Sequence, residues 1–139
     1  MKKFVWILVA TLLVGGFAIA ERVEAQKTKG KTRAAPTKLL MKGLVSANCG
    51  AAKKDLDAAE INWEDVTLHA ALLNESGYLL MDDGRCPDAE WAKAAKALQA
   101  TSAALLAAAE KKDAAAAKAA FGDLTAQSCK VCHAAHKGK

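Results

Sequence analysis

The feature that most limits the possible fold is a helical spacing of apolar residues from Pro36 to the end of the chain. Alanine is abundant there, aromatic residues make up only 5% of the whole sequence, and runs of β-branched residues are absent, so helix propensity is favourable almost throughout. About a hundred residues are enough for one core. Four amphipathic segments with short joints bury their apolar faces most simply as an antiparallel up-down bundle. We therefore predict an all-α four-helix fold for residues 36–139.

Capping residues and prolines predict where the helices begin and end. The first helix is expected from Pro36 to about Leu56, and its apolar stripe contains one polar residue, Asn48. The second helix opens at Asn62, a favoured N-cap, and runs to the turn DDGRCP. Pro87 then stands where helix starts tolerate proline. The sequence EKKD predicts the break before the fourth helix, and one long helix from 88 to 136 is the alternative.

The first 25 residues have the pattern of an export signal. Lys2 and Lys3 precede the apolar run FVWILVATLLVGGFAIA, and small residues suit cleavage after Ala20 or, preferably, after Ala25. An uncleaved membrane anchor is the alternative, but the run is short for a span of about 20 residues and contains a glycine pair. We therefore expect residues 1–25 to be a cleaved signal peptide and the protein to be exported.

Residues 26–35 are basic and contain few apolar side chains. Lys27, Lys29, Lys31 and Arg33 are present without any acid, and such a composition cannot bury enough surface to order itself. We predict a flexible basic arm that could touch an anionic membrane or an acidic partner. Nucleic acid is not expected as a partner, because no aromatic residues accompany these charges in an exported chain.

The C-terminal sequence SCKVCHAAHKGK contains the most specific chemical motif. Cys129, Cys132 and His133 form C-x-x-C-H, the attachment sequence of c-type haem. Two cysteines on one helical turn can form thioethers to the haem vinyl groups, while the adjacent histidine reaches the iron from the same side. The sequence therefore predicts one covalently bound haem c near the C-terminal end of the fourth helix, with His133 as the proximal iron ligand.

Two other readings of the motif are weaker. A zinc-stabilised structural bundle would use the two cysteines with His133 and His136, which crowds every ligand onto one short helix end. A thioredoxin-like dithiol would need a βαβ context, and the helical pattern does not provide one. Export also favours haem, because covalent haem attachment takes place outside the cytoplasm in bacteria. We therefore expect the bacterial periplasm as the location.

A C-x-x-C-H motif that closes the last helix of a four-helix bundle resembles the cytochrome c-prime family, the class II cytochromes c. The likeness covers residues 36–139 in architecture and is clearest in AAAAKAAFGDLTAQSCKVCHAAHK, while MKGLVSANCGAAKKDL resembles the family's first helix. The resemblance implies thioethers at Cys129 and Cys132, His133 as proximal ligand and Lys137 near a haem propionate.

The sequence departs from the family pattern at three places around the haem. The segment from Phe121 to Cys129 is one residue longer than usual, His136 stands where an aromatic residue is common, and the first helix lacks an Arg-Gln pair. These departures concern the haem surroundings and leave the attachment motif intact.

The resemblance implies two kinds of function. Six-coordinate haem with a methionine ligand suits electron transfer, whereas five-coordinate haem binds nitric oxide or carbon monoxide. Our leading expectation is a periplasmic monohaem cytochrome that exchanges electrons with redox partner proteins, with the gas-binding module as the alternative and a homodimer left open. We expect no enzyme, since the sequence shows no nucleophile, acid-base pair or phosphate loop that would support one.

Met41 is the first candidate for the distal iron ligand. It lies five residues into the first helix, about 8 Å from the haem end of the bundle at 1.5 Å per residue, close to the level of His133. Ordinary core packing is the alternative role for this methionine. Met81 is the lesser candidate, and Leu80 and Trp91 are expected to form the apolar wall around the porphyrin.

The same rise per residue gives the expected positions of His69, Cys49 and Cys86 along the bundle axis. His69 lies about 20 Å from the haem end, so it is expected to be a core histidine and not a ligand. Cys49 and Cys86 are left over after haem attachment, and an oxidising compartment favours disulfides. However, an axial separation of about 20 Å exceeds the roughly 7 Å that a disulfide allows between Cα atoms, which argues against this bridge.

Overall fold

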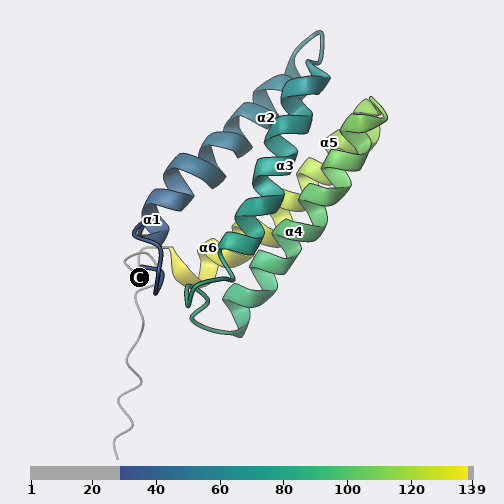
Figure 1. The fold of residues 1–139 in the computed structure, drawn as a ribbon. Coiled ribbons are helices and arrows are strands. Elements are labelled where there is room, and N and C mark those ends of the chain that lie inside the picture. The colour runs from purple at the N-terminus through teal and green to yellow at the C-terminus, as the bar shows by residue number, and fades with distance from the viewer. Residues whose placement is uncertain (1–28, 138–139) are drawn as a thin grey trace, which may run out of the picture.

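The computed structural model describes residues 29–137, and its regular secondary structure is entirely helical. The segments combine into four long helices that run up and down in one bundle (Figure 1). The predicted all-α four-helix bundle is therefore confirmed. The elements are α1 (Thr37–Leu40), η1 (Met41–Ser46) and α2 (Ala47–Asp57) in the first helix, α3 (Trp63–Leu79) in the second, α4 (Ala89–Glu110) in the third, and α5 (Ala114–Asp123), η2 (Leu124–Cys129) and α6 (Lys130–His136) in the fourth.

Three polar side chains cap the helices where the chain turns. The Asn62 side chain accepts hydrogen bonds from the backbone N–H groups of Glu64 and Asp65, which begins α3. Asp88 caps α4 in the same way, and Asp113 caps α5. Each cap satisfies N–H groups that have no partner within the helix. The predicted N-cap at Asn62 and the predicted break before Asp113 are both confirmed.

The core divides into two clusters along the bundle axis. One cluster lies toward the end that contains α6, and it has Trp91 and Leu98 at its centre. The other lies toward the α3 start and the α4–α5 turn, and it is built largely from alanine on α3, α4 and α5. Small side chains allow the facing helices to pack closely. The larger side chains are therefore concentrated near α6, where the site described below is formed.

The polar residue in the first helix has a specific partner on the second. Asn48 is buried, its Nδ2 donates to the Leu44 carbonyl at 2.7 Å, and its Oδ1 lies 2.9 Å from Nδ1 of His69. The other ring nitrogen of His69 lies 3.6 Å from Asp55 Oδ2. Buried polar groups require such partners. His69 is therefore a satisfied histidine between the first two helices, as the sequence predicted.

Residues 29–36 form an N-terminal strap that crosses the turn between α3 and α4. The Asp83 carboxylate accepts hydrogen bonds from the Thr32 backbone at 2.9 Å, the Thr32 hydroxyl at 2.9 Å and the Arg33 backbone at 3.0 Å. Arg33 also pairs with Asp82 at 3.3 Å. Gly30 is required by this contact, because a Cβ there would lie 1.7 Å from the Asp83 carboxylate.

Buried Arg85 holds the other side of the strap. It is only 1% exposed and donates to the Ala35 carbonyl at 2.7 Å. This placement differs from the flexible arm expected for residues 26–35, of which residues 26–28 lie outside the described part. The composition argument considered only apolar burial, whereas the strap is ordered by hydrogen bonds and by charge complementarity with the two aspartates of the turn.

Within residues 29–137, no helix has the length and apolar character needed to cross a bilayer. The predicted signal peptide, residues 1–25, lies outside the described residues.

Candidate haem-binding site

A cavity of about 780 Å³ opens between the first helix, α4 and the C-terminal half of the fourth helix. Figure 1 shows α1 and α6 at the same end of the bundle, which is why residues far apart in the sequence share this cavity. Its volume lies in the range of roughly 300–1,000 Å³ that is usual for small-molecule sites. All seven residues predicted for the haem site line it, namely Met41, Leu80, Trp91, Cys129, Cys132, His133 and Lys137.

The C-x-x-C-H residues follow one another along the end of the fourth helix. Cys129 ends η2, and Cys132 and His133 lie on the first turn of α6. Both cysteines are half-buried, while His133 is more exposed at the cavity. Burial raises the pKa of the Cys132 thiol, and the charge of Asp88 acts in the same direction. The arrangement places two thiols one helical turn apart with an accessible imidazole next to them.

Two π-helical turns border the cavity. η1 contributes Met41 and Val45, and η2 contributes Thr125 and Cys129. Single π turns are frequent at functional sites, because they redirect side chains without ending the helix. A π turn also accommodates one extra residue. η2 therefore explains how the segment from Phe121 to Cys129 can be one residue longer than in the family that it resembles.

The apolar wall contains the two predicted residues and one that sequence analysis did not assign. Trp91 is 3% exposed, and its Nε1 donates to the Leu80 carbonyl at 2.7 Å. The His136 ring packs edge-on against Trp91, with ring centroids 5.3 Å apart and an interplanar angle of 77°. His136 Nε2 lies 3.4 Å from Asp88 Oδ1. The imidazole of His136 therefore stands where an aromatic residue is common in the family that the sequence resembles. In the sequence, its spacing of three residues from His133 indicated that the two histidines share one side of the helix.

The structure separates the candidate distal ligands. Met41 lies on η1 and lines the cavity, where it also packs against the adjacent hydrophobic cluster. Met81 packs against the same cluster but is not among the residues that line the cavity, and neither is His69. Met41 is therefore the one methionine of the described residues that shares the cavity with His133.

Cys49 is the main residue of the site that the sequence analysis placed elsewhere. It follows Met41 and Val45 at successive intervals of four, so it lies on the same helix face and lines the cavity. The Cys129 thiol donates a hydrogen bond to the Cys49 sulfur, which lowers the pKa of Cys49 to about 7 against the opposing effect of burial. The same hydrogen bond, together with burial, raises the pKa of Cys129.

Cys49 does not pair with Cys86. All four cysteines, which lie within the described residues, are free thiols. The Cys86 Sγ donates to the Asp88 carbonyl at 3.4 Å, and Cys86 is not a lining residue of the cavity. The sequence argument against a Cys49–Cys86 bridge stays a prediction.

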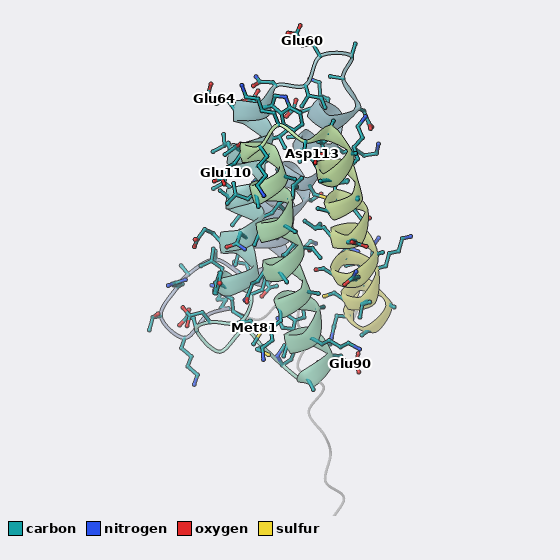
Figure 2. All side chains as sticks on the ribbon, turned by 90° about the vertical axis from the view of Figure 1, so that its right-hand side faces the viewer. Glu60, Glu64, Met81, Glu90, Glu110 and Asp113 are labelled. Atoms are coloured by element: carbon teal, nitrogen blue, oxygen red, sulfur yellow. The ribbon has the colours of Figure 1, made fainter. Side chains whose placement is uncertain are left out.

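Charge is distributed unequally along the bundle. Lys38, Lys42, Lys53 and Lys137 line the cavity, and no aspartate or glutamate is among its lining residues. At the opposite end, a second hollow of about 760 Å³ is lined by Glu60, Glu64 and Glu110 together with Trp63. Figure 2 shows Glu60, Glu64, Glu110 and Asp113 at one end of the bundle and Met81 and Glu90 toward the other. The basic cavity therefore favours a ligand that carries carboxylates.

No protein-family model and no curated protein matches the chain. Among solved structures, cytochrome c′ from Thermochromatium tepidum is similar, with 24% sequence identity and a TM-score of 0.60 over 74% of this chain and 92% of that protein. This chain has the cytochrome c′ fold. The shared architecture is the one that the position of the C-x-x-C-H motif and the helix pattern predicted.

The residues that this cytochrome c′ fold presents are chemically suited to haem c. Thiols at Cys129 and Cys132 can be alkylated by two vinyl groups, His133 offers an imidazole, and Met41 offers a thioether from the first helix. Among residues 29–137, no three or more His, Cys, Asp or Glu side chains are placed to hold a metal ion together.

Proposed function

We propose that the protein is a periplasmic monohaem c-type cytochrome that carries electrons and catalyses no reaction of its own. Haem c would be attached through Cys129 and Cys132, with His133 as the proximal and Met41 as the distal iron ligand. The observation that carries this proposal is that Met41 and the C-x-x-C-H residues line one cavity. The cytochrome c′ fold of the chain supports it.

Each group of cavity residues has a part in this function. Bound haem c supplies one-electron redox chemistry at its iron. Leu80 and Trp91 give the cavity an apolar wall that excludes water, which favours the less charged oxidation state. Lys137 and Lys38 provide positive charge for the propionate groups. The helices keep these side chains in place, so little rearrangement accompanies electron transfer.

The basic residues also suggest the kind of partner. Lys38, Lys42 and Lys53 lie along the first helix beside the cavity, and a positive surface around a redox group favours encounter with an acidic redox protein. The N-terminal sequence supports export, and we propose the bacterial periplasm as the place of this exchange.

A second candidate function is binding of nitric oxide or carbon monoxide at a five-coordinate haem. It is favoured by the packing of Met41 against the hydrophobic cluster around Trp91, because a methionine held there by packing would leave the distal position free. In that case the cavity beside Met41 and Val45 would receive the gas.

The test is to express the full chain with a bacterial c-type haem maturation system and to record mass and optical spectra. We expect one covalent haem, a Soret band, a low-spin spectrum and a weak sulfur-to-iron charge-transfer band. Met41→Leu should remove that band and lower the reduction potential, because a thioether ligand raises it. Met81→Leu is the matched control and should keep the band.

A high-spin spectrum that Met41→Leu leaves unchanged would reject electron transfer through a Met/His haem in favour of gas binding. A chain that carries no covalent haem would contradict both functions.

A further inference from the structure

We propose that Cys49 and Cys129 form a disulfide in the haem-free chain, which closes the cavity and withholds Cys129 from haem attachment until the bond is reduced. The disulfide itself is independent of the proposed function, whereas its effect on haem attachment rests on it.

The pairing follows from where the two cysteines lie. Cys49 belongs to α2 and Cys129 ends η2, so the two thiols come from the first and the fourth helix. Both line the same cavity, and each shifts the pKa of the other. Both are half-buried and both pack against the hydrophobic cluster around Trp91. A disulfide needs the two sulfurs at about 2.0 Å. Forming it therefore draws the first and fourth helices together across the space that the haem would occupy.

The other possible pairs are less well placed. Cys86 lies in the turn before α4, where its Sγ donates to the Asp88 carbonyl, and it is not a lining residue of the cavity. Cys132 is on the next turn of the fourth helix and has no hydrogen bond to Cys129 among the contacts of that thiol. Their shared place in the cavity and their mutual interaction thus select Cys49 as the partner of Cys129.

The thiol chemistry favours Cys49 as the attacking group. Its pKa is lowered to about 7, so a large fraction is thiolate at neutral pH. Thiols with a pKa near the ambient pH are the most effective nucleophiles in disulfide exchange. Burial and the hydrogen bond raise the pKa of Cys129, so that thiol reacts second.

The oxidant is an external disulfide, and the exchange has two steps. The Cys49 thiolate attacks one sulfur of the external disulfide, forms a mixed disulfide and releases one thiolate. The Cys129 thiol then loses its proton and attacks the Cys49 sulfur, which releases the second thiolate. In total, two protein thiols become one disulfide, and the external disulfide is reduced to two thiols that take up the two protons.

The first experiment maps the cysteines in the haem-free full chain. The chain is incubated with oxidised glutathione, alkylated without reduction, digested and analysed by mass spectrometry. We expect a linked peptide containing Cys49 and Cys129, with Cys86 and Cys132 alkylated. A Cys129–Cys132 or Cys49–Cys86 link as the main product, a mixture of pairings, or four alkylated thiols would each overturn the proposal. Far-UV circular dichroism establishes in the same sample that the helices are formed.

The second experiment measures covalent haem attachment before and after reduction with dithiothreitol. Before reduction, Cys49→Ser should attach haem severalfold more completely than the unmutated chain, and Cys86→Ser, the matched control, should behave like the unmutated chain. After reduction, all three should be equal. Equal attachment by the unmutated chain and Cys49→Ser before reduction overturns the inference. If no variant attaches haem even after reduction, the proposed function fails, while the mapped Cys49–Cys129 link still stands.

Discussion

The hydrogen bond between Trp91 and the Leu80 carbonyl can be tested by replacing Trp91 with phenylalanine. Trp91 Nε1 donates to this carbonyl at 2.7 Å, and both residues are at most 5% exposed. Phenylalanine keeps an aromatic ring that can pack against His136 but has no N–H group. The substitution therefore removes one buried hydrogen bond at the end of α3 and leaves most of the cavity wall in place.

The expected loss is about 2 kcal/mol of unfolding free energy. A typical hydrogen bond contributes about 1 kcal/mol net, but removing one partner leaves a buried acceptor unsatisfied, and the cost is then about 1–3 kcal/mol. Trp91→Ala also removes the aromatic packing and should cost about 3–5 kcal/mol. The difference between the two variants then measures the packing of the ring separately from its hydrogen bond.

The assay is urea unfolding of the chain, followed by far-UV circular dichroism. With a slope of about 1–3 kcal/mol per molar urea, a loss of about 2 kcal/mol moves the midpoint by roughly 1 M without a change in slope. Trp63→Phe is the control, because Trp63 is half-buried at the opposite end of the bundle, and it should shift the midpoint less. If Trp91→Phe costs under about 0.5 kcal/mol, the Leu80 carbonyl has found another partner and the reasoning is refuted.

Three further outcomes follow from the polar contacts. Burial acts to raise the pKa of Asp83, but hydrogen bonds from Thr32 and Arg33 outweigh it and hold the pKa below its usual value. The Asp83 carboxylate therefore stabilises docking of the strap fully at pH values above its usual pKa, and this stabilisation is lost as pH falls below about 4. In Asp83→Asn, docking should become independent of pH. Amide hydrogen exchange of the strap measures both outcomes. Asn62→Ala should cost about 1 kcal/mol in urea unfolding by removing the α3 cap, and an unchanged midpoint would contradict that role. His69→Ala should keep the haem spectrum of the unmutated chain while lowering its thermal midpoint; loss of a low-spin spectrum in the folded variant would make His69 a ligand.

The fold could be predicted because its determinants are local. Caps at Asn62 and Asp113, the proline after the DDGRC turn and the spacing of apolar residues act within a few positions of each helix end. Part of the cavity lining could be predicted for a related reason. The rise of an α-helix converts sequence position into height along the bundle, and Met41 and His133 line one cavity while His69 does not. That these residues bind haem stays a prediction.

Contacts that depend on how helices face one another could not be predicted in this way. Height along the axis put Cys49 far from the haem end, yet Cys49 lines the cavity and interacts with Cys129. Helix rise alone could not show this contact, because it also depends on the rotation of two helices about their own axes. The strap was missed because its order comes from Asp83, about 50 residues away in sequence. Long-range polar contacts leave no periodic signal.

The π turn η2 has a consequence for engineering haem proteins. Each residue of an α-helix advances the chain by about 100° around its axis, so one residue added to a plain α-helix turns everything after it by about that angle. A π turn takes up the added residue locally and keeps the following helix in phase. Deleting Gln127, which is exposed in η2, should therefore convert η2 into plain α-helix and leave Cys132 and His133 at the cavity. For a designer, a π turn ahead of C-x-x-C-H is a place where the length of the helix can change by one residue without turning the motif away from its host.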